Sequence, residues 1–220
     1  MDYQDLLALM QGRRSIRRFT NRPVSRDDLN RLLEAARWAP SNHNRQPWRF
    51  LVIEQAERIA ALADCVKQHL PGRLMALPAV ASAYAREFAR YATSFAGAPV
   101  LLVACHQRPV SVSGALLDGL RHPTLVSGEP LSVAMAAQNL LLAAHSLGLG
   151  ACVLTAPLLV EDALAPLLGV PAGFDVTCLV ALGYPDESPA APRRKSLELI
   201  AEFSDPPLSS TDDEDRRGDL

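Results

Sequence analysis

The sequence predicts a single domain that contains both α-helices and β-strands. Segments whose apolar residues recur at helical spacing alternate with short apolar runs of strand length. Hydrophobic residues make up 49% of the 220 residues, which is enough for an extensive core. No internal repeat or linker divides the chain before residue 203, and residues 204–220 have the acidic, Ser- and Pro-rich composition of a disordered tail. We therefore expect one domain over residues 1–203 and a separate tail over residues 204–220.

The first third of the chain contains three expected helices and one strand. Asp2–Met10 has a short amphipathic pattern. Ser25 has the side chain of an N-cap, and acidic residues follow it in the first turn of a helix that ends before Pro40. Trp48–Glu54 is nearly continuously apolar, as in a buried strand, and Glu57–Val66 returns to helical spacing.

The rest of the chain continues this alternation. Helical patterns cover Ala79–Thr93, the segment from Pro130 to Gly148, and Glu161–Leu168. Apolar runs typical of strands cover Pro99–Ala104, Ala151–Thr155 and Phe174–Leu182. The segment from His106 to Gly128 carries Gly, Pro and Ser without a clear period. Such a long irregular connection is often a lid or a binding loop.

Several side chains in these helices have an ordinary structural interpretation. Tyr84, Phe88 and Tyr91 lie near one helical face, where core packing is favoured over a role in substrate binding. Gln138 and Asn139, inside a helix rich in alanine, are expected to bond neighbouring backbone rather than a ligand. His145, near the end of the same helix, is interpreted as a partner of helix carbonyls rather than as a catalytic group.

Charge and cysteine content argue against several classes of protein. The net charge of −2 gives no reason to expect binding to nucleic acid or to a membrane. The longest apolar runs are too short to span a bilayer, and the N-terminus lacks a signal-peptide pattern. The four cysteines form no CxxC pair, so we expect reduced thiols and a cytoplasmic protein.

The usual catalytic motifs are missing from the sequence. No glycine-rich GxGxxG joins a strand to a helix, and there is no Walker A sequence and no GxSxG nucleophile elbow. The five histidines do not have the spacing of metal ligands, so we expect no metal site. A protein without such groups often takes its chemistry from a cofactor.

The segment from Arg13 to Phe19 is a candidate phosphate site. Ser15 sits among its arginines, and the apolar pair Ile16 and Phe19 anchors the segment. Guanidinium groups bind a doubly charged phosphate through paired hydrogen bonds. A solvated charged face is the alternative interpretation of the same residues.

A second polar segment, from Ala39 to Phe50, joins the second helix to the first strand. It is crowded with amide and hydroxyl side chains, more than a simple connection requires. Such groups are suited to bind the edge of a planar, hydrogen-bonding ring. Together with the arginine segment, this turn suggests a site for flavin mononucleotide (FMN).

These motifs resemble those of the nitroreductase family of FMN-dependent oxidoreductases. Four matches occur in order: Arg13–Phe19, Ala39–Trp48, Ala136–Leu154 and Pro192–Leu197. The resemblance implies an α+β fold in three layers, with a mixed central sheet of about four strands between helices. It also implies an intertwined homodimer in which each sheet gains a strand from the partner subunit and each FMN lies at the subunit interface.

The resemblance further implies cofactor-binding roles for individual residues. One subunit would hold the phosphate and ribityl chain through Arg13, Arg14, Ser15, Arg17, Arg193 and Lys195, with Arg194 as a substitute in the last cluster. The other subunit would contribute Pro40, Ser41, Asn42 and Asn44. Val153, Leu154 and Thr155 would line the isoalloxazine, with the Thr155 backbone N–H near flavin N5. No catalytic acid or base is implied.

The expected activity is transfer of a hydride from NADH or NADPH through flavin N5 to a nitroaromatic, a quinone or a similar acceptor, with ping-pong kinetics. Two alternatives stay open: an FMN-dependent oxidase or dehydrogenase of a specific metabolite such as a cyclodipeptide, and a flavin-binding module without turnover. Relatives that make dimethylbenzimidazole usually carry Asp at the position of Ser15, and dehalogenating relatives usually carry Glu at that of Gln46. Both activities are therefore less favoured.

Overall fold

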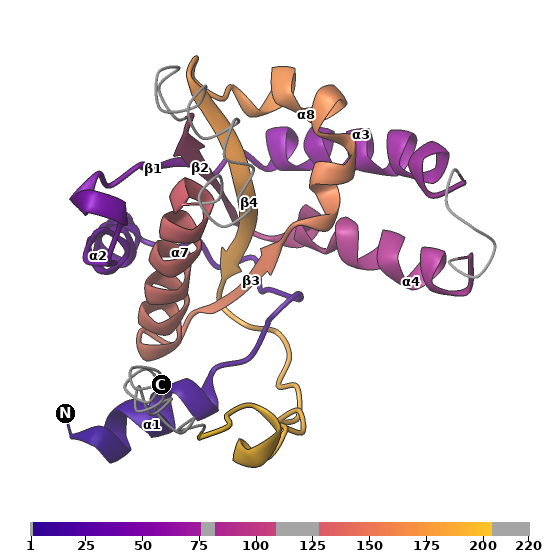
Figure 1. The fold of residues 1–220 in the computed structure, drawn as a ribbon. Helices are drawn as coiled ribbons and strands as arrows, with labels where there is room; N and C mark the ends of the chain where they lie inside the picture. Colours follow the sequence, from indigo (N-terminus) through magenta and orange to yellow (C-terminus); the bar gives the residue numbers. More distant parts are fainter. Residues whose placement is uncertain (1, 76–81, 109–127, 204–220) are drawn as a thin grey trace, which may run out of the picture. The chain divides into compact units, whose positions relative to one another are not determined.

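The computed structural model describes residues 2–75, 82–108 and 128–203. The chain divides into two compact units, residues 1–190 and 191–220. The first unit contains the sheet and its covering helices (Figure 1). In the second, the short helix η5 (Leu197–Leu199) is described, whereas the tail expected over residues 204–220 lies outside the described residues. The expected domain end at residue 203 therefore stays a prediction.

A four-stranded sheet forms the centre of the first unit. Its strands are β1 (Trp48–Ile53), β2 (Val100–Gln107), β3 (Gly150–Leu154) and β4 (Phe174–Gly183), in the spatial order β1-β2-β4-β3. The four strands predicted from the sequence are thus confirmed, with ends that differ by at most three residues. Leu102 lies opposite Val180, which in turn lies opposite Val153.

The pairing directions differ in one respect from the mixed sheet that the resemblance implies. Every neighbouring pair among these four strands is antiparallel. The reason is that β4 inserts between β2 and β3, which run in the same direction and would otherwise pair in parallel. In the described residues, parallel pairing occurs as a single bridge between Ser15 and Ala151, beside β3 at the sheet edge. A strand exchanged from a partner subunit stays a prediction.

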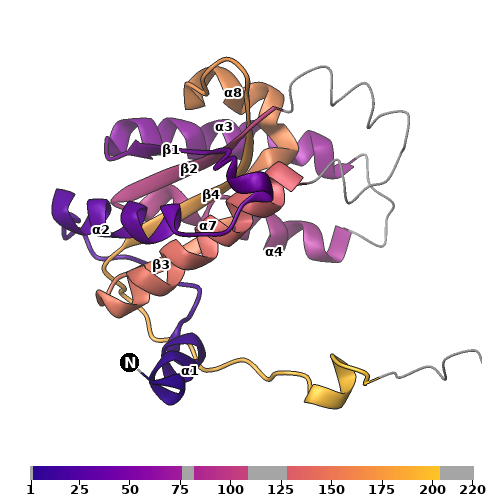
Figure 2. The same cartoon turned by 60° about the vertical axis from the view of Figure 1, so that its left-hand side comes forward.

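Helices cover both faces of this sheet, which explains why its antiparallel strands are apolar on both sides. The helices α2 (Arg26–Arg37) and α7 (Gly128–Ser146) pack on the face that includes Leu102 and Val180. On the other face, α3 (Ala56–Met75) and α8 (Glu161–Leu168) pack around Leu101 and Leu179, and α4 (Ser82–Ala92) lies on the same side (Figures 1 and 2). The α+β class and its three layers are confirmed.

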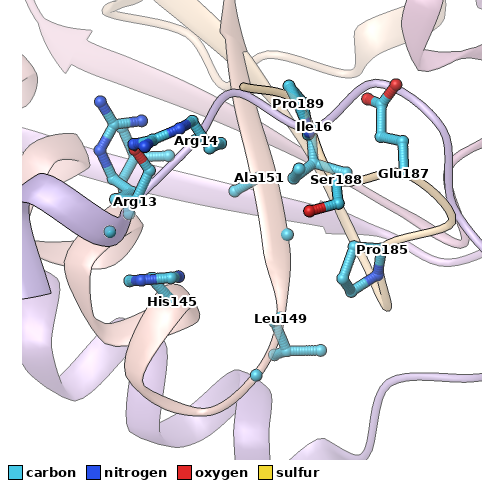
Figure 3. Close-up of a pocket in the computed structure, with 14 residues that line it drawn as sticks. Arg13, Arg14, Ile16, His145, Leu149, Ala151, Pro185, Glu187, Ser188 and Pro189 are labelled. Atoms are coloured by element: carbon cyan, nitrogen blue, oxygen red, sulfur yellow. The ribbon is translucent and has the colours of Figure 1, made fainter. Parts of the chain in front are cut away.

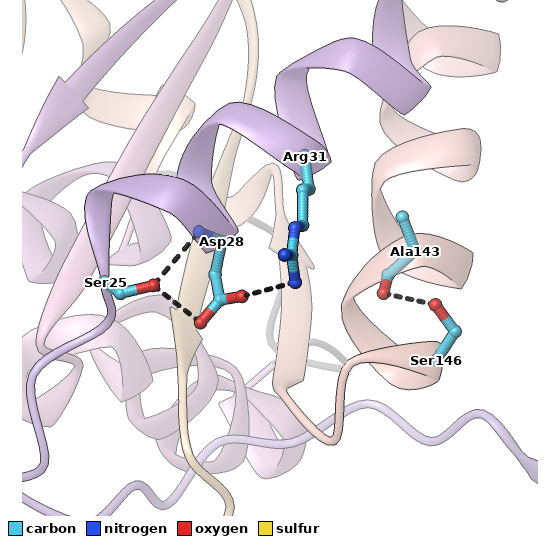
Figure 4. Close-up of polar contacts among 5 residues, drawn as sticks. All are labelled: Ser25, Asp28, Arg31, Ala143 and Ser146. Carbon is cyan, nitrogen blue, oxygen red and sulfur yellow. Dashed lines mark hydrogen bonds and ion pairs between the residues drawn. The ribbon is translucent and has the colours of Figure 1, made fainter.

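Local signals in the sequence set the ends and the packing of α2. The Ser25 hydroxyl accepts from the Asp28 backbone N–H at 3.0 Å and donates to the Asp28 carboxylate at 2.8 Å (Figure 4). Arg31 forms an ion pair with the same carboxylate at 3.6 Å. The Asn139 amide of α7 donates to the Ala35 carbonyl at 3.2 Å. Both the N-cap and the expected backbone partner of Asn139 are therefore confirmed.

The first helix, α1 (Tyr3–Gly12), has a different environment. A reciprocal capping box between Asp2 and Asp5 fixes its start. None of its residues is buried, although Tyr3, Leu6 and Met10 are apolar and exposed. This helix therefore presents apolar surface that the described part of the chain leaves uncovered.

Elsewhere the structure extends or qualifies the expectations. Helix α3 continues past the predicted end at Val66 to Met75, because Leu70 adds another buried side chain. Four short 3-10 helices complete the described elements: η1 (Asn42–Asn44), η3 (Ser94–Gly97), η4 (Ala156–Val160) and η5. Most of the connection expected to form a lid, residues 109–127, lies outside the described residues. No described helix is both long and apolar enough to cross a membrane.

Candidate functional site

The arginine segment lies against the edge strand β3. The Ile16 backbone N–H donates to the Ala151 carbonyl at 3.1 Å, and Ser15 forms the parallel bridge to the same residue. The Ile16 side chain is buried and lies directly over Gly150. A Cβ at position 150 would be 2.7 Å from Ile16 Cβ, so the glycine permits this close approach. The expected anchoring by Ile16 is confirmed.

Two guanidinium groups in this segment have unused donors. Arg14 Nη1 donates to the Gln11 carbonyl at 2.6 Å and to the Arg13 carbonyl at 2.9 Å. The Arg17 guanidinium lies over the ring of Tyr91, with Cζ 4.8 Å from the ring centroid. In both arginines Nε is buried without a hydrogen-bond partner among the described residues. Because buried donors are nearly always paired in folded proteins, these two atoms indicate a missing acceptor.

Glu187 holds the backbone of the same segment, a role that the sequence did not predict. Its carboxylate accepts from the Arg17 backbone N–H at 2.6 Å and from the Arg18 N–H at 3.1 Å. It also forms an ion pair with Arg18 Nε at 3.4 Å. The partners are about 170 positions apart along the chain, so no local pattern could reveal the contact.

A pocket of about 260 Å³ lies beside the arginine segment. Figure 3 shows Arg13, Arg14 and His145 on one side, and Pro185 and Ser188 on the other. The His145 ring packs against α1. Its Nε2 lies 2.7 Å from the position that a Cβ on Gly12 would occupy. His145 thus packs between α1 and α7, and its interpretation as a partner of helix carbonyls stays a prediction.

The asparagine-rich turn has an unusual backbone. His43, Asn44 and Gln46 all have left-handed φ angles, at 50°, 52° and 49°. Such angles cost roughly 1–3 kcal/mol each in non-glycine residues and tend to occur at functional sites. Inside the turn, the Gln46 backbone N–H donates to the Ser41 hydroxyl at 3.0 Å, and the Gln46 amide donates to Asn44 Oδ1 at 3.3 Å.

The first turn of α7 supports this strained segment. The Asn42 backbone N–H donates to the buried Ser132 hydroxyl at 3.4 Å, and that hydroxyl donates to the Gly128 carbonyl at 2.8 Å. Arg45 forms an ion pair at 3.6 Å with Glu129, a carboxylate residue that is only 8% exposed. The turn is thereby fixed to the N-terminal end of the helix.

Consequently, one chain does not bring the two halves of the expected site together. The asparagine-rich turn contacts Ser132 near the N-terminal end of α7, whereas Gly12, beside the arginine segment, contacts His145 near the C-terminal end. These helix positions are 13 residues apart, or about 20 Å at the rise of an α-helix. Pro40, Ser41, Asn42 and Asn44 therefore belong to a different region from Arg13, Arg14, Ser15 and Arg17.

The other expected site residues differ in accessibility. Val153 is 38% exposed and Thr155 is also exposed, whereas the Leu154 side chain is buried in the core. Leu154 can therefore offer only its backbone to a ligand. Arg193 and Lys195 are exposed in the second unit, and their roles stay predictions.

Burial raises the pKa of the three buried cysteine thiols of the sheet. Burial raises the pKa of Cys152, while the cations of Arg17 and Arg13 act in the opposite direction. It also raises the pKa of Cys105 to about 11 and that of Cys178 to about 12. All four cysteines of the chain are free, and these three buried thiols stay protonated at neutral pH. Nor do the described residues gather three or more His, Cys, Asp or Glu side chains as metal ligands.

The fold and the site define a three-layer α+β protein with a cationic segment along an edge strand. The sequence model of one known family, the nitroreductase family, matches residues 10–184 of the chain. The chain therefore belongs to the nitroreductase family, a family of oxidoreductases, and the resemblance inferred from the sequence is confirmed.

Individual relatives agree with this assignment. The 5,6-dimethylbenzimidazole synthase of Rhodospirillum rubrum is 31% identical over 86% of each chain. A BluB-like flavoprotein from Clostridium difficile 630 superimposes with a TM-score of 0.74 at 26% identity, over 93% of this chain and 100% of that chain. A nitroreductase with bound FMN from Desulfitobacterium hafniense DCB-2 has a TM-score of 0.67 at 25% identity, with the same coverage.

Proposed function

We propose that the protein is an FMN-dependent oxidoreductase that uses NADH or NADPH to reduce a nitroaromatic, a quinone or a similar acceptor. Bound FMN would supply the hydride transfer between donor and acceptor. The observation that carries this proposal is the pair of buried, unpartnered Nε atoms on Arg14 and Arg17 among the described residues. Both arginines belong to the segment that, by the family resemblance, would bind the FMN phosphate.

The residues of the arginine segment fit a phosphate group. Arg13, Arg14, Ser15 and Arg17 are all partly accessible, so each side chain can contact a ligand, although Nε of Arg14 and of Arg17 is itself buried. Bonds from guanidinium groups to phosphate are charge-assisted and roughly twice as strong as neutral hydrogen bonds. Glu187 and Ile16 hold the backbone of the segment before any ligand binds, which lowers the entropy cost of binding. The acceptor that these donors require is thus best supplied by the FMN phosphate.

We infer that the complete site needs two subunits. The asparagine-rich turn and the arginine segment contact opposite ends of α7, so one cofactor would take Pro40, Ser41, Asn42 and Asn44 from the partner of the chain that supplies the arginines. Exposed apolar residues support a homodimer: Leu131 and Met135 on α7 are 51% and 39% exposed, and α1 has no buried residue. Arg193 and Lys195 would add cations to the phosphate end.

The end of β3 would face the redox-active ring. Val153 offers an exposed apolar side chain that can pack against a planar ring and exclude water. The backbone N–H of Thr155 is proposed as a donor to that ring. Among the described residues near β3, the buried thiols are protonated, and no side chain is assigned as an acid or base. The protein would bind and orient, while the cofactor and the nicotinamide carry out the chemistry.

Three other functions are less well supported. Similarity to a dimethylbenzimidazole synthase would allow chemistry on the flavin itself, but Ser15 occupies the position where those relatives usually carry Asp. A flavin-dependent dehydrogenase of a specific metabolite, such as a cyclodipeptide, would have the same cofactor site and a different electron donor. A flavin-binding module without turnover would bind FMN and reduce nothing.

Anaerobic titration separates these possibilities. Purified protein is reconstituted with FMN, and NADH or NADPH is added without oxygen while flavin absorbance is followed. The proposal expects stoichiometric bleaching by at least one nicotinamide, followed by reoxidation with a nitroaromatic or a quinone. Absence of flavin binding would refute the proposal. Bound flavin that neither nicotinamide bleaches would favour the metabolite dehydrogenase, and reduced flavin that no acceptor reoxidises would favour the module.

A further inference from the structure

We propose that Tyr91 of α4 is a positioning residue for Arg17: its ring holds the guanidinium at β3 and leaves the charge and N–H groups available to an anion. This inference rests on the proposed FMN site and extends it to a helix that the sequence assigned to the core. Phe88 and Tyr91 are in fact 36% and 37% exposed, so the interpretation of these two side chains as core residues is wrong.

The contact geometry is that of a cation–π interaction. Arg17 Cζ lies 4.8 Å from the centroid of the Tyr91 ring, within the range of about 6 Å in which the ring face attracts a cation. The Tyr91 hydroxyl donates to Glu87 Oε1 at 3.1 Å, one helical turn earlier, and this bond fixes the ring. Arg90 lies against the same ring at 5.3 Å, which adds a second positive charge beside Arg17.

An aromatic partner differs from a carboxylate in what it leaves free. A carboxylate would accept from the guanidinium N–H groups and neutralise the charge, whereas a ring face attracts the cation without accepting through oxygen atoms. Among the described residues, Arg17 makes no side-chain ion pair, and its Nε is buried without a partner. The Glu187 carboxylate accepts from the Arg17 backbone N–H and not from the guanidinium.

Arg17 is therefore held at both ends. Glu187 fixes the backbone N–H, and Tyr91 fixes the guanidinium, so an arriving phosphate does not have to order the side chain. Ordering one long side chain on binding would otherwise reduce the affinity. In this position the Arg17 cation is close to β3: burial raises the pKa of the Cys152 thiol, and Arg17 is the cation that opposes this shift most strongly.

Variants of Tyr91 and Arg17 test the inference through binding alone. FMN is titrated into apo-protein and its fluorescence is followed, and inorganic phosphate is used as a competitor. We expect Tyr91→Leu to weaken FMN binding about 3- to 10-fold, and Tyr91→Phe, which keeps the ring, by less than about 2-fold. Phe88→Leu is the matched control, because Phe88 is equally exposed on the same helix and makes no cation–π contact among the described residues.

A double-mutant cycle distinguishes positioning from general structural damage. If Tyr91 acts through Arg17, Tyr91→Leu has no further effect on FMN or phosphate affinity in an Arg17→Ala background. An undiminished loss in that background would overturn the inference, and so would wild-type affinity in Tyr91→Leu. Should Tyr91→Leu fail to fold, Tyr91→Phe decides the matter, because an affinity loss as large as that of Arg17→Ala would exclude a role for the ring. Failure of the wild-type protein to bind FMN would instead refute the proposed function.

Discussion

Substitution of Gly150 by alanine tests how the arginine segment is held against β3. The added Cβ would lie 2.7 Å from Ile16 Cβ and 2.8 Å from both Ile16 Cγ1 and Cγ2. A change of side-chain rotamer moves the two Cγ atoms but not the Cβ, so the backbone of the segment must move away from the strand. Overpacking of this kind typically costs about 1–3 kcal/mol. For a chain of this size that corresponds to a fall in Tm of about 2–12 °C.

The same displacement should weaken cofactor binding, because Ser15 and Arg17 flank Ile16. Thermal unfolding of the apo-protein and FMN titration measure the two effects separately. Gly72→Ala is the matched control: Gly72 is exposed in α3, would have nothing within 4 Å of an added Cβ, and should gain up to about 1 kcal/mol from the better helix propensity of alanine. A Tm for Gly150→Ala equal to or above that of the wild type, with unchanged FMN affinity, would refute the reasoning.

Three further predictions concern other parts of the molecule. Gly169 has φ +65° at the C-terminus of α8, so Gly169→Ala should cost about 1 kcal/mol and lower the Tm in a thermal scan. Leu131→Glu, on the exposed side of α7, should convert a dimer to folded monomer in size-exclusion chromatography with light scattering. Burial lowers the pKa of His106 below its usual 6.5, even though Asp175 acts in the opposite direction. As the pH falls, the unfolded chain therefore binds a proton at His106 before the folded chain does, and the free energy of unfolding should fall below about pH 6.5. Urea unfolding at several pH values should show this fall, and His106→Gln should reduce it.

The elements of the fold could be predicted because each has a local cause. Four apolar runs became the four strands, and Ser25 caps α2 as its side chain suggests. Ile16 anchors the arginine segment because it is an apolar residue among cations. These signals lie within a few residues of the structure that they specify, so one sequence is enough to find them.

The parts that could not be predicted depend on contacts between distant segments. The bond from Arg17 to Glu187 requires that β4 be inserted next to β3, and no periodicity encodes that order. The exposure of Tyr91 depends on which face of α4 other segments cover, since its helical spacing alone resembles that of a core residue. The contribution of Leu154 was also beyond the sequence: it is expected to line the proposed site, but the alternation of the strand turns its side chain into the core and leaves only its backbone for that role.

A site divided between two chains would couple cofactor binding to dimerisation. A ligand that binds only the dimer stabilises it by mass action, by about 2.7 kcal/mol per site at a free concentration one hundred times its Kd. With the asparagine-rich turn at one end of α7 and the arginine segment at the other, each subunit would contribute to both sites of the dimer. Leu131 is not assigned to either half, so loss of FMN affinity in a Leu131→Glu variant that has become a folded monomer would support a role for the partner. If the monomeric variant instead binds FMN as tightly as the wild type, one chain suffices and the division of the site is wrong.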